Sequence, residues 1–186
     1  MLPALPPWTG LHPLIVHFPI ALLLVAPLLI VLSVLLRRHR GGFGAAALVL
    51  MLVGTVAAFV AVSTGEAAGD LAERTPGVAA ALERHGELAE TTRTIFAVLT
   101  GMFVVIYAAP LVRRREWPNG LYVALSLVFL TFYAGGAVTL VNTAHLGGQL
   151  VHQYGVRAML GPATVASDGN TDAQPPSSAT RDRDDR

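Results

Sequence analysis

The sequence contains no cysteine and no lysine, and only 13% of its 186 residues are charged. Without cysteine the chain cannot form disulfides, thiolate metal sites, cysteine-ligated iron–sulfur clusters or a covalent attachment to haem. It also lacks a phosphate-binding glycine loop, a G-x-S-x-G nucleophile elbow and an HExxH zinc motif. Nothing here supports a hydrolase, and the net charge of +1 gives no sign of nucleic-acid binding. We therefore do not expect a stand-alone enzyme.

Apolar residues make up 53% of the chain and gather in four long segments that contain no Asp, Glu or Arg. A bare charge at the centre of a bilayer costs several kcal/mol, and about 20 residues of helix cross the hydrocarbon. The pattern predicts an all-α fold, a four-helix transmembrane bundle within residues 1–160. The predicted spans cover residues 14–36, 43–62, 95–112 and 121–141. Residues 161–186 have no apolar period, and we expect them to form a disordered tail.

Arginine is unevenly distributed among the connections between these segments. The two short loops, 37–42 and 113–120, contain six Arg and one Glu. Loops rich in Arg stay on the cytoplasmic side of a membrane. We therefore expect both termini and the 63–94 loop to lie outside (N-out/C-out). All Lys and Arg positions are Arg, and Ala is abundant, which suggests a GC-rich bacterial genome. We therefore expect a multi-pass protein of the bacterial cytoplasmic (inner) membrane.

This topology places five of the six histidines on the outer side of the membrane, and only His39 in a cytoplasmic loop. The five outer residues are His12, His17, His85, His145 and His152. Helices rise about 1.5 Å per residue. On that scale His17, His145 and Glu66 come from three different helices and lie near the outer hydrocarbon boundary.

A second layer of imidazole is expected further from the membrane centre. His85 and His152 would lie roughly 15 Å beyond the first layer. The predicted pairs are therefore His17 with His145, and His85 with His152 or His12. His17 is the strongest candidate, because ionisable residues inside an apolar run are functional candidates by default.

Three functions fit this arrangement. The first is a b-type haem protein or electron-transfer subunit with a redox partner on the outer face, because bundle cores hold haem between facing helices. Its predicted axial ligands are His17 and His145, with His85 and His12 as further candidates. The second is a non-haem site of His17, Glu66, His145 and His85 for Zn, Cu or Fe. The third is a structural or partner subunit without a cofactor, in which the histidines hydrogen-bond between helices.

Three stretches resemble a family of bacterial membrane proteins known as domain of unknown function 2231. They are residues 12–19 (HPLIVHFP), 82–89 (LERHGELA) and 145–156 (HLGGQLVHQYGV). The resemblance covers about residues 11–158 and implies a four-span integral membrane domain. The family has no established activity, but its members often stand beside redox domains, which favours electron transfer. His152 stands where the family motif has tyrosine, so the resemblance carries no ligand role to it.

Overall fold

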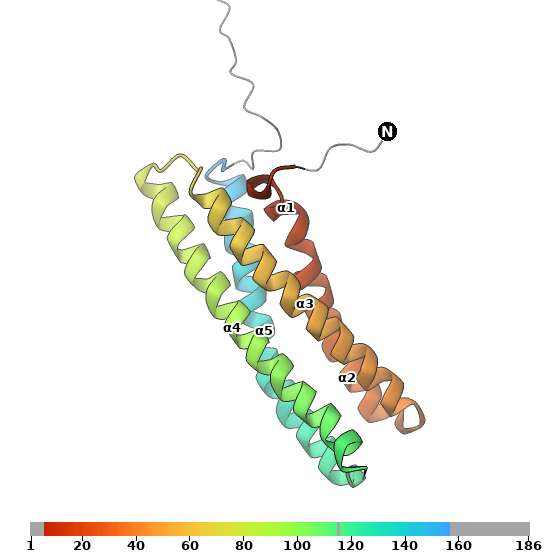
Figure 1. Ribbon diagram of the computed structural model, residues 1–186. Helices are drawn as coiled ribbons and strands as arrows, with labels where there is room; N and C mark the ends of the chain where they lie inside the picture. Colours follow the sequence, from red (N-terminus) through yellow and green to blue (C-terminus); the bar gives the residue numbers. More distant parts are fainter. Residues whose placement is uncertain (1–5, 115, 157–186) are drawn as a thin grey trace, which may run out of the picture.

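The computed structural model describes residues 6–114 and 116–156, and the predicted tail at 161–186 lies outside them. Four long helices dominate this part of the chain (Figure 1): α2 (His17–Leu35), α3 (Arg40–Gly69), α4 (Pro76–Arg113) and α5 (Asn119–His152). Shorter elements are η1 (Trp8–Gly10) and α1 (His12–Ile15) before α2, and η2 (Arg37–His39) after it. Four helices are long and apolar enough to span a membrane, and the described residues form no strand. The prediction of an all-α, four-helix membrane fold is confirmed.

The four helices run side by side as an up-and-down bundle (Figure 1). Helix α2 packs against α3 and α5, and α4 packs against the same two helices. The α2–α3 and α4–α5 connections lie at one end, which we call the arginine end. The α3–α4 turn, α1 and the end of α5 lie at the other, which we call the histidine end. The polar 63–94 stretch is mostly helical, because α3 continues to Gly69 and α4 starts at Pro76.

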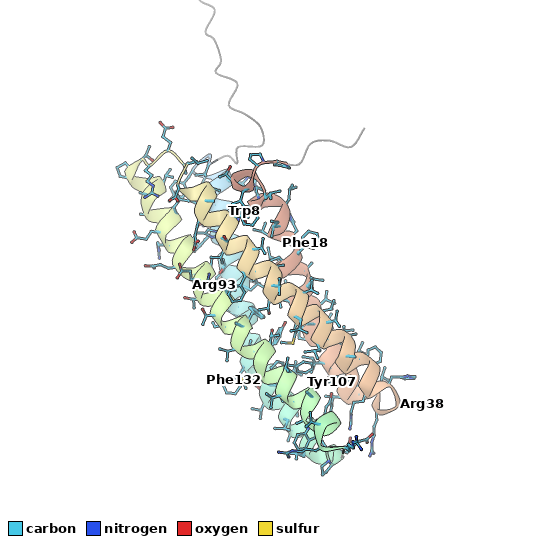
Figure 2. The ribbon with its side chains drawn as sticks, in the orientation of Figure 1. Trp8, Phe18, Arg38, Arg93, Tyr107 and Phe132 are labelled. Atoms are coloured by element: carbon cyan, nitrogen blue, oxygen red, sulfur yellow. The ribbon has the colours of Figure 1, made fainter. Side chains whose placement is uncertain are left out.

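The core is a column of apolar side chains along the bundle axis, with aromatic rings at its centre. The ring of Phe129 lies 5.2 Å from that of Phe103 and 5.8 Å from that of Tyr133, centre to centre. Other large apolar side chains point outward: Figure 2 shows Phe18 and Phe132 on the outer surface, each about 60% exposed. An apolar exterior around a packed aromatic core is what a bilayer environment favours.

One of these core aromatics, Tyr133, donates a hydrogen bond to a backbone carbonyl of another helix. Pro27 lies inside α2 and has no N–H, so it cannot donate the usual helical hydrogen bond to the Leu23 carbonyl. The Tyr133 hydroxyl, from α5, donates to that carbonyl oxygen at 2.5 Å. Both residues are almost fully buried. A carbonyl without a partner would be costly inside a membrane, so this contact both satisfies α2 and joins it to α5.

The same device occurs near the arginine end of the bundle. Pro110 lies inside α4, which deprives the Ile106 carbonyl of its helical donor. The indole N–H of Trp117 donates to that oxygen at 3.0 Å. Trp117 belongs to the short connection before α5, so the bond also anchors this connection against α4.

Candidate functional site

Two histidine rings meet at the histidine end of the bundle. His12 is the first residue of α1, and His85 lies in the polar first half of α4. Their ring centres are 6.4 Å apart, with the planes at 82°, and both side chains are half-buried. No carboxylate forms an ion pair with either ring in the described residues. Burial disfavours the charged form of both rings, and two imidazolium ions this close would also repel each other, so the pair is suited to remaining neutral.

His12 is held in a defined orientation by a neighbouring helix. Its Nδ1 lies 2.8 Å from the Ala61 carbonyl oxygen of α3. A carbonyl can only accept, so Nδ1 carries the proton and Nε2 of the neutral ring keeps a lone pair. Metal-binding histidines commonly have this arrangement, in which a backbone carbonyl holds one nitrogen and leaves the other to the ligand.

His85 has one ring nitrogen that is buried without a regular hydrogen bond, although its ring also interacts with the Thr143 backbone of α5. Its Nδ1 has no hydrogen-bond partner among the described residues. Buried polar atoms are nearly always paired, and an exception calls for a ligand, a water or a proton to be placed there. One imidazole nitrogen at this site is therefore unpaired and covered by neighbouring atoms.

Glycines leave the space that the two rings occupy. A Cβ atom at Gly65 would lie 2.9 Å from Cε1 of His12, and one at Gly147 would lie 3.1 Å from Cε1 of His85. Both distances are shorter than ordinary carbon–carbon contacts. The glycines on α3 and α5 thus allow the rings to approach these helices closely.

A cavity of about 510 Å³ opens beside the two rings, between α3 and α4. Its charged lining consists of four carboxylates and one guanidinium: Glu66, Asp70, Glu83, Glu90 and Arg74. Arg74 lies 3.5 Å from Asp70 on an exposed part of the wall. A smaller cavity of about 130 Å³, with Gly147 and Leu150 in its wall, also borders both rings. The larger cavity is therefore negative in sum and open to a cation.

The other predicted site residues are placed differently. His17 and His145 have exposed side chains, and Nε2 of His145 lies 3.2 Å from the Gln149 side-chain nitrogen on its own helix. His152 is exposed as well. Glu66 lines the larger cavity, together with His12 and His85. Of the two partners predicted for His85, the structure thus places His12, and not His152, beside it.

The structure does not gather the predicted four-residue metal set into one place. Within residues 6–114 and 116–156, no three His, Asp or Glu side chains lie close enough to hold a metal ion between them. The pair itself rests on Ala61 and Gly65, which sequence reasoning did not single out. The signal available for Gly65 was its position directly before Glu66, at the end of an apolar segment.

Comparison with known families supports the membrane assignment. A family profile described as "Predicted membrane protein (DUF2231)" matches residues 9–159. The chain belongs to the DUF2231 family. The DUF2231 match includes all four long helices and both rings of the histidine pair. It confirms the resemblance found in the sequence and identifies a membrane protein. Comparisons with curated proteins and with solved structures found no match.

Replacing Gly65 with Ala is expected to displace the His12 ring. The added Cβ would lie 2.9 Å from Cε1 and 3.0 Å from Nδ1, the atom that bonds the Ala61 carbonyl. Loss of that hydrogen bond should lower the free energy of unfolding by about 1 kcal/mol relative to Gly86→Ala, because both variants gain the same helix propensity. Thermal unfolding and ¹⁵N-histidine NMR of the full-length protein would measure both effects. Gly86→Ala is the matched control, because it lines the same cavity with no atom within 4 Å of the new Cβ. Equal behaviour of the two variants would contradict the contact.

Proposed function

We propose that this membrane protein holds a redox-active metal cofactor between His12 and His85 and exchanges electrons with a partner at the histidine end. The main support for this proposal is the distance between the ring centres of His12 and His85. An imidazole nitrogen binds a transition metal at about 2.0 Å, which puts the ring centre about 3 Å from the metal. Two imidazoles that share one metal ion therefore have their centres within roughly 6 Å of each other. The His12 and His85 rings, packed edge to face, have a centre separation of 6.4 Å, which is close to this limit.

Haem b is the first form of this cofactor. His12 and His85 would hold the haem through neutral imidazoles from separate helices, and the absence of cysteine excludes covalent attachment. Bound haem would supply a one-electron iron couple. In this reading, the Ala61 carbonyl orients His12, and the free nitrogen of His85 acts as the second donor.

A metal ion without porphyrin is the second form, favoured by the carboxylates of the cavity. Glu66 lines the same cavity as His12 and His85 but does not form a three-ligand group with them. The two imidazoles would hold Zn, Cu or Fe, and the carboxylates would attract it. Four carboxylates against one guanidinium attract a cation, whereas they would repel the two propionates of haem. Of the two forms, only this one uses the negative charge of the cavity.

The location follows from the arginines of the two short connections. We place the protein in the bacterial cytoplasmic membrane with its arginine end inside, according to the positive-inside rule. The histidine end then faces the outer compartment, where a redox partner would have to dock.

Spectra and metal content of the full-length protein, purified after expression with ample haem and metal, test both forms. The haem form should show a Soret band with reducible visible bands, and the metal form a stoichiometric metal without these bands. In either case His12→Ala and His85→Ala should remove the signal, whereas His17→Ala, at an exposed position, should retain it. A preparation with neither haem nor stoichiometric metal would refute the proposal. The contact between His12 and Ala61 would then serve only to hold α1 on α3.

A further inference from the structure

Five arginines that form no ion pair with any described residue lie at the arginine end. The arginine rim, as we call it, consists of Arg37, Arg38, Arg40, Arg113 and Arg114. None of the five forms an ion pair with another described residue. Glu116 is the single acidic residue in these two connections. A strong positive patch therefore remains at one end of the bundle.

Arg40, at the start of α3, links the two connections at the arginine end. Its guanidinium bonds the Asn119 side-chain oxygen at 2.5 Å and lies 4.2 Å from the centre of the Tyr122 ring. Nearby, the Tyr107 hydroxyl donates to the Gly41 carbonyl at 3.1 Å, which fixes α4 against the start of α3. The start of α3 is thus linked to the start of α5 and to α4.

The remaining rim arginines are exposed, directly beside apolar surface. Leu35, which is 70% exposed, precedes Arg37 by two residues, and Val112, which is 81% exposed, directly precedes Arg113. Figure 2 shows Arg38 extending away from the end of the bundle. Guanidinium groups at the edge of a lipid-facing surface lie at the depth of lipid headgroups, and they bind phosphate oxygens through paired N–H donors.

We infer that the arginine rim binds the phosphate of anionic phospholipids. The exposed arginines contact the headgroup, and Arg40 acts as a positioning residue that holds the two connections in register. The neighbouring Leu35 and Val112 provide contact for acyl chains, which a free phosphate ion lacks. This inference does not depend on any cofactor at the other end of the bundle.

Lipid-dependent thermal unfolding tests the inference. Full-length protein in nonionic detergent is titrated with palmitoyl-oleoyl phosphatidylglycerol, with the matching phosphatidylcholine, or with inorganic phosphate. Phosphatidylglycerol should raise the melting temperature most, and added salt should weaken the effect. R38Q should weaken the apparent phosphatidylglycerol affinity about fivefold, and R37Q/R38Q on the order of 30-fold, as expected for charges near an anionic surface.

R84Q is the control, because Arg84 is also exposed but lies near the histidine end; its lipid affinity should match that of the wild type. If the glutamine variants fail to fold, R37K/R38K keeps the charge and should still weaken binding, since lysine cannot form the paired contact. Equal shifts with both lipids, or with phosphate and phosphatidylglycerol, would overturn the inference. So would an R84Q loss as large as that of R38Q.

Discussion

Replacing Phe129 with Ala should lower the free energy of unfolding by about 3–5 kcal/mol, the usual cost of deleting a buried aromatic ring. Phe129 is 1% exposed and contacts the rings of Phe103 and Tyr133 at the centre of the core. Packing of this kind, rather than exclusion of water, holds helices together in a bilayer. Equilibrium unfolding of the full-length protein in mixed micelles would measure the change.

Phe132→Ala provides the matched control on the same helix. Phe132 is 61% exposed and lies on the outer surface (Figure 2), so lipid or detergent fills the space that its ring leaves. Its replacement should cost much less than that of Phe129. Similar losses for the two variants would show that α5 does not present its Phe129 face to the core.

Tyr133→Phe should cost about 1–3 kcal/mol, because it leaves the Leu23 carbonyl without a partner in the interior. The cause of this cost lies on another helix, since Pro27 is the residue that cannot donate to Leu23. In a Pro27→Ala background the missing N–H is restored. The same Tyr133→Phe change should then cost clearly less, and the difference between the two backgrounds is a coupling energy of about 0.5 kcal/mol or more.

Chemical unfolding of the wild type, both single variants and the double variant would complete this cycle. Thr131→Val on the same helix is a suitable control, because the Thr131 hydroxyl is exposed and bonds within its own helix. Its cost should be the same in both backgrounds. Additive costs for Tyr133 and Pro27 would refute the idea that one residue compensates for the other.

The two ends of the bundle carry side chains of opposite charge. The histidine end combines an imidazole pair with a negative cavity. The arginine end carries arginines that form no ion pair within the described part of the chain, beside exposed leucine and valine. The proposed cofactor and the inferred lipid site therefore make independent demands on the chain. Variants at one end leave the chemistry of the other end available as an internal control.

The membrane fold was determined by the sequence alone. Four segments without Asp, Glu or Arg can cross a bilayer only as structures that satisfy their own backbone, and helices of this length do so. The resemblance to DUF2231 was likewise visible in three short stretches and is confirmed by the family match. Neither result requires knowledge of how the helices face one another.

The pairing of side chains was decided only by the tertiary structure. Depth along a helix follows from counting residues, and it predicted one layer with His17, His145 and Glu66. Direction around a helix turns by about 100° per residue, so it depends on how each helix packs. Packing leaves His17 exposed and brings His12, on its separate turn of helix, to His85. The bond from Tyr133 to Leu23 is of the same kind, because a proline shows that a carbonyl is free but not which distant hydroxyl will reach it.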